Sequence, residues 1–289
     1  MKKIIAIVGL TSSGKSSLGI ELAKFFDGEI VSADSRQVYK GLDWCSGKVT
    51  KDEQLEAKHH LLDVCELGNR YTLFDFQKQA YYEIDKILSK NKLPILVGGT
   101  GLYVRAVVEG YNLTEDKPDE NLRKMLEEKT LDELVKIAKE KNIEIPNEPT
   151  ARRLIRLLEK SKTQSPNKPK YEVLMIGIKW PRDQIYERIK LRLEMRMPHM
   201  IEEIKKLLAQ GVSEEFLVSL GLEAKFIVRY LKNEFESYDD FFEELFKEER
   251  HFAKRQQTWF NKDKNIVWID ANENLVEKSK NIIKEFLKN

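Results

Sequence analysis

The chain is poor in cysteine and has no long apolar run. Cys45 and Cys65 are the only cysteines among 289 residues, too few for a disulfide framework, and their spacing fits no zinc module. The first apolar run, Ile4 to Val8, is far too short to cross a membrane. These absences argue against a disulfide-stapled secreted domain and an integral membrane protein, and we expect a cytoplasmic protein that does not bind membranes.

A strong excess of one charge is also absent. The sequence has 50 Lys and Arg against 48 Asp and Glu, a net charge of +2, which excludes a histone-like cation. Residues 109–148 nevertheless carry 12 acidic and 7 basic side chains, whereas residues 152–206 carry 15 basic and 7 acidic ones. A segment with this basic excess either forms a solvated helix face or binds a polyanion, and composition leaves both open.

The sequence alternates between short apolar runs and segments with helical spacing. The runs predict buried strands at residues 4–8, 29–32, 93–97, 173–178 and 266–269. This alternation predicts an α/β fold, a parallel sheet flanked by helices, with a helical C-terminal half. Residues 113–149 contain no such run, and we expect a small helical insertion there in a core made of 1–112 and 150–289. Pro198 should break or kink the helix predicted at 182–211.

A phosphate-binding motif follows the first strand. Gly9 to Ser16 fits the pattern GxxxxGK[ST] between a strand and a helix, the context that a P-loop requires. Backbone N–H groups of such a loop surround an anion at a helix N-terminus. Lys15 adds a positive charge, and the Ser16 hydroxyl can hold Mg²⁺. The motif predicts a P-loop NTPase-like sheet.

Acidic residues at the ends of the other strands are scarce. P-loop kinases usually place a metal-binding acid there, but the strand at 93–97 ends in Gly98-Gly99-Thr100-Gly101, a second possible anion cradle. The one acid at a strand end is Asp34. It could bind metal, accept a proton or cap the next helix, and spacing does not decide between them.

Two further motifs have more than one interpretation. His59-His60 favours a structural or substrate-positioning role over a metal site, because adjacent residues project differently and no third ligand is near. The block Lys254 to Phe260 combines cations, amides and aromatics, which suits phosphate and base contacts. A helix that packs Trp259 into the core would fit the same spacing.

Together these motifs resemble the tRNA dimethylallyltransferases, or tRNA isopentenyltransferases, of the bacterial type. The resemblance runs over nearly the whole chain in the right order. It is carried by Gly9 to Ser16, Ser32 to Asp43 with its Asp-Ser-Arg-Gln-Val-Tyr block, His59 to Asp63, Asp75-Phe76, Leu96 to Tyr103 with Gly-Gly-Thr-Gly-Leu-Tyr, Arg152 to Arg156, and Ala253 to Phe260. The sequence departs from the family pattern at Asp43 to Lys48, at Arg196 to His199 and at Gly221 to Ala224.

The resemblance implies transfer of a dimethylallyl group from dimethylallyl diphosphate to the exocyclic N6 amine of the adenosine 3′-adjacent to the anticodon of tRNA. It implies a Mg²⁺-dependent enzyme, working as a monomer, that grips the anticodon stem-loop. The P-loop would then hold the diphosphate leaving group, not ATP. This would account for the missing acid after the strand at 93–97, because no γ-phosphoryl group is transferred.

Roles for individual residues also follow from the resemblance. The implied catalytic residues are Asp34 as the base, Thr100, and Arg192 as a diphosphate clamp. The implied diphosphate ligands are Gly9, Thr11, Ser12, Ser13, Gly14, Lys15 and Ser16, with Ser16 also holding Mg²⁺. The implied tRNA contacts are Asp34, Ser35, Arg36, Gln37, Thr100, Arg123, Arg152, Arg153, Leu154, Ile155, Arg156, Lys254, Arg255, Gln256 and Trp259.

Three other functions fit part of the sequence. A small-molecule P-loop kinase would transfer a γ-phosphate and would have no use for the Lys254–Phe260 block. An isopentenyltransferase acting on free adenine nucleotides would not need the basic segment at 152–206. An RNA-binding module with a vestigial P-loop would not need an intact Lys15, Ser16 and Asp34. Labelled dimethylallyl diphosphate offered with tRNA or AMP would distinguish them.

Overall fold

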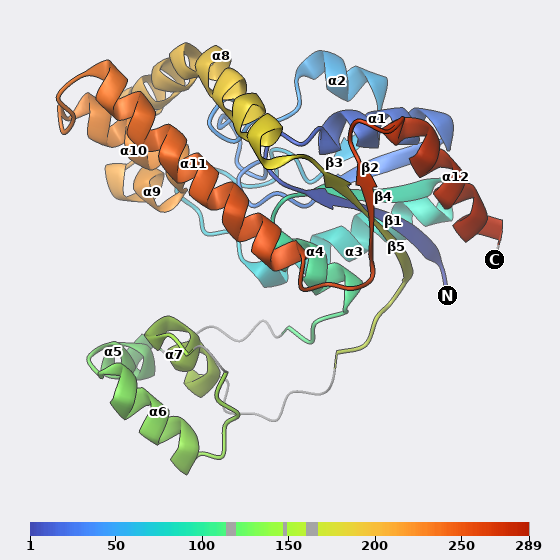
Figure 1. The fold of residues 1–289 in the computed structure, drawn as a ribbon. Helices are drawn as coiled ribbons and strands as arrows, with labels where there is room; N and C mark the ends of the chain where they lie inside the picture. Colours follow the sequence, from blue (N-terminus) through green and yellow to red (C-terminus); the bar gives the residue numbers. More distant parts are fainter. Residues whose placement is uncertain (114–119, 147–148, 160–166, 289) are drawn as a thin grey trace. The chain divides into compact units, whose positions relative to one another are not determined.

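The computed structural model describes all residues except 114–119, 147–148, 160–166 and 289. Its sheet has six parallel strands in the order β3-β2-β4-β1-β5-β6 within these residues (Figure 1). The strands are β1 (Lys3–Gly9), β2 (Gly28–Ser32), β3 (His59–His60), β4 (Leu93–Gly98), β5 (Glu172–Lys179) and β6 (Ile266–Asp270). The predicted α/β fold and its five strands are confirmed, and the two-residue β3 was too short to predict.

The register of the sheet brings the loops with the sequence motifs to one edge. β1 is central, with Ile5 paired to Ile95 on one side and to Leu174 on the other. Because all strands are parallel, their carboxyl ends lie at the same edge, which is where α/β proteins bind ligands. The loops that follow Gly9, Ser32 and Gly98 therefore meet there.

Helices cover both faces of the sheet (Figure 1). On one face α1 (Lys15–Phe25) and α12 (Leu275–Lys288) pack Leu22 and Ile283 against inward side chains such as Ile5 of β1. On the other face α3 (Leu73–Ser89), α4 (Gly101–Val108) and the end of α11 pack Phe76 and Phe260 against residues such as Ala6. Burial on both faces explains why the strands are apolar throughout.

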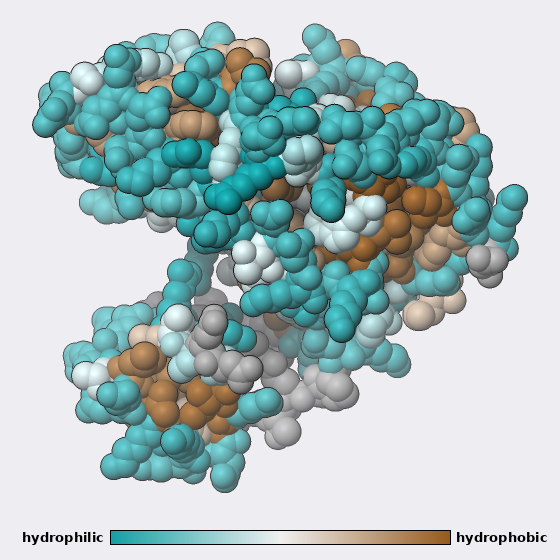
Figure 2. All heavy atoms as spheres, in the orientation of Figure 1, coloured by the Kyte–Doolittle hydropathy of each residue, from teal (hydrophilic) through white to brown (hydrophobic). Residues whose placement is uncertain are grey.

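The helical C-terminal half has a core of its own. It contains α8 (Arg182–Ala209), α9 (Glu214–Ser219), α10 (Leu222–Leu231) and α11 (Tyr238–Phe260), with α2 (Lys51–Glu56) elsewhere in the same unit. Phe241, Ile227 and Met197 are fully or almost fully buried in this core together with residues from the loop after β2. The sequence predicted a break or a kink at Pro198; helix α8 continues through this residue, so it is not broken there, and a kink stays a prediction. Hydrophilic side chains cover most of the visible face over α8 and α11 (Figure 2).

The chain divides into two compact units. The larger unit comprises Met1–Gly110 and Pro169–Asn289, and the smaller comprises Tyr111–Lys168. The smaller unit contains α5 (Glu120–Glu127), α6 (Leu131–Glu140) and α7 (Ala151–Glu159) around a small apolar core. Helix α7 packs on α5 and α6, so the smaller unit extends beyond the expected insertion at 113–149. No helix among the described residues is long and apolar enough to cross a membrane.

Helix α8 anchors the loop that follows β2. The Glu203 carboxylate accepts hydrogen bonds from three successive backbone N–H groups, those of Asp43 and Trp44 at 2.7 and 2.8 Å and that of Cys45 at 2.8 Å. The Trp44 ring stacks on His199 of the same helix with 4.1 Å between ring centroids. One carboxylate therefore satisfies the amides of a whole turn.

We expect Glu203→Ala to lower the free energy of unfolding by roughly 1–3 kcal/mol, because three amides lose a charged acceptor. Urea denaturation would measure the loss. Glu202→Ala is the matched control: among the residues that the structure describes, Glu202 pairs with Lys205 alone, on the helix surface, and its loss should change stability by less than about 0.5 kcal/mol. Equal losses for both variants would contradict the role assigned to Glu203.

Candidate active site

The P-loop wraps around a space at the end of β1. Gly14, which directly precedes α1, has a φ of 91°, and Ser12 has a φ of 59°, both in the left-handed region. This backbone turns successive N–H groups inward, the arrangement that binds anions. The Ser13 hydroxyl is buried and has no hydrogen-bond partner among the described residues. A buried hydroxyl without a partner is costly, which points to a polar ligand in this space.

Lys15 is the cation of the loop. Its ammonium group donates a hydrogen bond to the Leu10 carbonyl within the same loop. Burial and the nearby Arg192 guanidinium lower the pKa of Lys15 to about 7, and the Asp34 carboxylate opposes this shift. The charged form of Lys15 thus lacks sufficient negative charge around it, which an anionic ligand would supply.

Two side chains that the sequence did not single out hold the P-loop from outside. The Trp180 indole, just after β5, donates to the Ser13 carbonyl at 2.9 Å. Arg188 of α8 donates to the Ser12 carbonyl at 3.0 Å, and its guanidinium lies 4.4 Å from the centre of the Trp180 ring. These two hydrogen bonds fix the Ser12 and Ser13 carbonyls, which are therefore not available to point toward a bound anion.

Arg192 reaches the P-loop from one turn further along α8. Its guanidinium donates to the Thr11 hydroxyl at 3.3 Å and to the Gly47 carbonyl at 3.2 Å. Burial and Arg196 lower the pKa of Arg192, while Glu223, Glu249 and Asp34 act in the opposite direction. The structure thus brings Arg192 and Lys15 together as two neighbouring, partly buried cations.

Asp34 follows β2 at the same edge. Its Oδ1 accepts hydrogen bonds from the backbone N–H groups of Arg36 at 2.8 Å and Gln37 at 3.4 Å, so this oxygen caps a turn. Its Oδ2 accepts no hydrogen bond from any residue that the structure describes. The capping role and a chemical role, which the sequence left as alternatives, are compatible because they use different oxygens.

Thr100 connects the loop after β4 to the loop after β2. Its hydroxyl accepts a hydrogen bond from the Ser35 N–H at 3.1 Å, and its own N–H donates to the Ala33 carbonyl at 3.4 Å. Thr100, Ser35 and Asp34 are therefore held as one group. The Gln37 side chain is not part of this group, because its amide donates to the Gly47 carbonyl at 3.3 Å.

Gln256 of α11 links these loops to the C-terminal helices. Its Oε1 accepts a hydrogen bond from the Thr11 N–H at 2.8 Å, and its Nε2 donates to the Gly99 carbonyl at 3.0 Å. Gln256 is buried, with an exposed fraction of 7%. Both ends of the amide already bond inside the protein, and the expected contact of Gln256 with tRNA stays a prediction.

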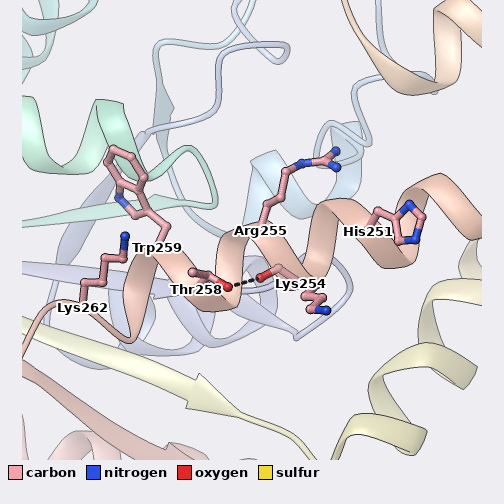
Figure 3. A pocket seen from close by; sticks show the side chains of 6 residues that line it. All are labelled: His251, Lys254, Arg255, Thr258, Trp259 and Lys262. Carbon is pink, nitrogen blue, oxygen red and sulfur yellow. Dashed lines mark hydrogen bonds between the residues drawn. The ribbon is translucent and has the colours of Figure 1, made fainter. Parts of the chain in front are cut away.

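Other members of the block lie on the outward face of α11, whereas Phe260 is buried in the core. Trp259, 39% exposed, lies so close to Gly101 that a Cβ at that position would overlap its ring. It borders a hollow of about 360 Å³, shown in Figure 3. The lining residues are His251, Lys254, Arg255, Thr258, Trp259 and Lys262. Sequence reasoning missed His251 and Lys262, although they lie at helical spacing from Arg255 and Trp259.

The smaller unit contains the remaining expected tRNA contacts. Arg152, Arg153 and Arg156 are exposed on α7, whereas Leu154 and Ile155 are buried in the core of this unit. The expected tRNA contacts of Leu154 and Ile155 stay a prediction. Arg123 pairs with Glu159 through two hydrogen bonds of 2.6 and 2.8 Å. Arg36, in the larger unit, lies beside Gly221 at the start of α10.

A metal site made of protein ligands alone is not evident in the described part of the chain, where no cluster of three or more His, Cys, Asp or Glu could hold an ion. The His60 Nε2 lies 2.7 Å from the Glu29 carboxylate, which also contacts Lys90. His60 is thus part of a hydrogen-bonded cluster around Glu29. The Ser16 hydroxyl, in the first turn of α1, would be the protein ligand of a Mg²⁺ ion that binds together with a diphosphate, since this ion usually takes few protein ligands and several phosphate or water oxygens.

Comparisons with known proteins give the family. Residues 37–263 match the family described as IPP transferase. A tRNA dimethylallyltransferase 2 of Treponema denticola is 42% identical over 281 residues, covering 92% of this chain and 94% of the relative. A tRNA dimethylallyltransferase of Streptococcus agalactiae is 40% identical over 294 residues, covering 99% and 98%.

A solved structure agrees with these relatives. The full-length tRNA isopentenylpyrophosphate transferase from Bacillus halodurans superposes with a TM-score of 0.78 at 33% identity, covering 100% of this chain and 97% of that one. The similarity thus extends over both units and the whole P-loop sheet. The resemblance seen in the motifs is confirmed, and the chain belongs to the IPP transferase family.

Proposed function

We propose that this protein is a tRNA dimethylallyltransferase, which moves a dimethylallyl group from its diphosphate to the N6 amine of the adenosine 3′-adjacent to the anticodon. The observation that carries the proposal is the pair of hydrogen bonds made by Gln256. They join the phosphate-binding loop to the helix whose outer face carries cations and an exposed tryptophan. A kinase of small molecules would need the loop without that helix.

The donor would bind with its diphosphate in the P-loop. Backbone N–H groups from Gly9 to Ser16 would surround the phosphates, the Ser13 hydroxyl would gain the partner it lacks, and Lys15 and Arg192 would supply positive charge. A Mg²⁺ ion between Ser16 and the phosphates would offset the charge that grows on the leaving diphosphate. Arg192, already hydrogen-bonded to Thr11, would clamp the same group from α8.

The acceptor would be the base of a flipped-out adenosine. Its amine nitrogen attacks the allylic carbon, the bond from carbon to the diphosphate oxygen breaks, and an amine proton must leave. Asp34 Oδ2 would take that proton while Oδ1 keeps the turn in place. Thr100 would hold the Asp34 loop through Ser35. Extruding the base costs a few kcal/mol, which contacts along the anticodon stem-loop would offset.

Labelled dimethylallyl diphosphate tests the assignment directly. The protein would be incubated with the donor and unmodified tRNA, or with the donor and AMP. We expect label in tRNA alone, at the adenosine next to the anticodon. Label in AMP and not in tRNA would move the chain to the nucleotide-specific transferases, and ATP-dependent phosphorylation without prenyl transfer would overturn the proposal.

Asp34→Asn separates the base from the turn cap. Asparagine keeps an oxygen that can accept from the Arg36 N–H but cannot take a proton, so the single-turnover rate should fall at least ~10²-fold while tRNA affinity stays within about threefold. Asp34→Ala should lose the cap as well and serves as the comparison. A rate for Asp34→Asn above about a tenth of wild type would contradict the base assignment.

Lys15 should make donor affinity depend on pH. The bound diphosphate favours the charged lysine, whose pKa in the free protein is about 7. Below pH 7 Lys15 is already charged before the donor binds, so its titration should add no pH dependence to the affinity. Above pH 7 the logarithm of the affinity should fall as the pH rises, because binding takes up a proton. Calorimetry of donor binding from pH 6 to 9 measures this. Lys15→Gln should bind the donor roughly 10- to 100-fold more weakly at pH 6, and its affinity should not decrease above pH 7. An affinity equal to that of the wild type would contradict the binding of the diphosphate by the P-loop.

The basic helix α7 should add salt dependence to tRNA binding. If Arg153 neutralises a tRNA phosphate, Arg153→Ala should weaken binding and reduce the slope of log affinity against log salt by roughly one. Arg156 lies 3.7 Å from Glu159 and should matter less. Arg153→Lys keeps the charge and is the control. Wild-type slopes for Arg152→Ala, Arg153→Ala and Arg156→Ala alike would show that this helix face is merely solvated.

A further inference from the structure

The Arg192 guanidinium is held between the P-loop and a turn formed by residues 43–48, in the loop after β2. Its Nη1 donates to the Thr11 hydroxyl at 3.3 Å, and its Nη2 donates to the Gly47 carbonyl at 3.2 Å. The Gln37 side-chain amide donates to the same Gly47 oxygen at 3.3 Å. The direction in which Arg192 points therefore depends on where the 43–48 turn places the Gly47 carbonyl.

Lys48 fixes this turn from within. Its side chain is only 2% exposed, and its Nζ is surrounded by the Asp43 carboxylate at 2.6 Å, the Asp63 carboxylate at 2.5 Å and the Tyr39 carbonyl at 3.0 Å. An ammonium group has three N–H donors, so these acceptors satisfy all of them. Because Lys48 directly follows Gly47 and bonds back to the first residue of the turn, its contacts close the turn.

Helix α8 fixes the same turn from another side. The Glu203 carboxylate accepts hydrogen bonds from its first three N–H groups. Arg196 donates to the Trp44 carbonyl at 3.0 Å and lies 3.7 Å from the Glu223 carboxylate of α10. Trp44, Arg196 and Glu223 come from the three segments in which the sequence departs from the family pattern. These departures thus meet in one place and form a single unit with the turn.

The absence of a side chain at position 47 leaves the space that Arg192 occupies. Gly47 has a φ of 57°, in the left-handed region that favours glycine. A Cβ at this position would overlap the Arg192 guanidinium and would lie 3.2 Å from the Arg196 Cζ. Arg196 is itself held by the Trp44 carbonyl, so Arg192 could not move aside in that direction. A side chain here would therefore displace Arg192 from the P-loop.

We propose that Gly47 is a positioning residue for the donor: the 43–48 turn, anchored by Lys48 and α8, uses the Gly47 carbonyl to keep Arg192 directed at the diphosphate. This inference rests on the proposed function, because it takes a diphosphate to be the ligand of Arg192. An arginine that is already fixed in the free protein loses little side-chain freedom when the ligand binds. An arginine without this support has to be ordered on binding, which lowers the affinity.

Calorimetry with inorganic diphosphate and with dimethylallyl diphosphate tests the role of Gly47. We expect Gly47→Ala to weaken the binding of both ligands roughly three- to tenfold, the cost of ordering one long side chain. Gly41→Ala is the matched control, because Gly41 also has a positive φ, of 73°, but a Cβ there would meet nothing within 4 Å. Its affinities should stay within about twofold of wild type. Equal losses for the two variants would overturn the proposal, because backbone strain alone would then explain them.

An Arg192→Gln background separates the positioning of Arg192 from a general effect on the P-loop. The shorter glutamine leaves room for a methyl group at position 47, so in this background Gly47→Ala should change diphosphate affinity by less than about twofold. The same loss in both backgrounds would contradict the proposal. The affinity for tRNA should stay within about twofold of wild type in Gly47→Ala, and a loss as large as that for diphosphate would point to a general structural defect instead.

Lys48→Met tests the anchor of the turn. Methionine keeps most of the length of the side chain but bonds to none of the three acceptors, so diphosphate affinity should fall roughly three- to tenfold, and this loss should also disappear in the Arg192→Gln background. A folded Lys48→Met protein with wild-type affinity would overturn the anchoring by Lys48. If this variant does not fold, Gly47→Ala, which adds a single methyl group, still decides whether the turn positions Arg192.

Crystal structures without ligand make the outcome independent of the transferase assignment. The Arg192 guanidinium should leave the Thr11 hydroxyl in Gly47→Ala and stay beside it in Gly41→Ala. An Arg192 that still reaches Thr11 in Gly47→Ala would overturn the proposal. A wild type that binds inorganic diphosphate, shows the expected substitution effects and transfers no dimethylallyl group would support the positioning role and count against the proposed function alone.

Discussion

The arrangement of the site depends on the two hydrogen bonds of one buried amide. Gln256 connects the loop after β1 to the loop after β4 and brings both under helix α11. A buried side-chain amide is stable only when its donor and acceptor are both satisfied, so the two loops cannot separate without leaving polar groups unpaired. The P-loop is thereby built into the helical half of the protein, and its distance from the cations of α11 is fixed by the fold.

The second organising constraint is electrostatic. Lys15, Arg192 and Arg196 bring three positive charges into a partly dehydrated space, and the lowered pKa values of Lys15 and Arg192 show that burial and mutual repulsion disfavour the charged forms. Such a site is prepared for an anion, because a diphosphate relieves a repulsion that already exists in the free protein. The repulsion lowers the stability of the free protein, and its relief on binding would increase the affinity for the donor.

Local features of this protein were predictable from its sequence, and long-range ones were not. Short apolar runs and the Gly9–Ser16 motif depend on neighbours in the chain, so the strands and the P-loop followed from pattern alone. Gln256 was expected to contact RNA because it lies in a block of cations, amides and aromatics. That it also bonds inside the protein depends on how α11 packs on the sheet, which the sequence does not show. The role of Glu203 as an acceptor for three backbone amides could not be predicted either, because its helix contains several other acidic residues with the same local pattern. Trp44 and His199 both lie in segments that depart from the family pattern, and only the structure shows that they stack on each other.

In the proposed function, helix α11 would serve both substrates. Its inward residues recur at helical spacing, with Glu249, Ala253, Gln256 and Phe260 buried against α8, the P-loop and the sheet. The hollow that contains Lys254 and Trp259 lies on the opposite side, where it can meet a polyanion. Because both sets of side chains project from one rigid helix, a shift of the helix needed to fit RNA would also move Gln256 and the loops that it holds. If tRNA binds in this hollow as proposed, its orientation and the shape of the phosphate pocket would therefore be mechanically linked through this helix.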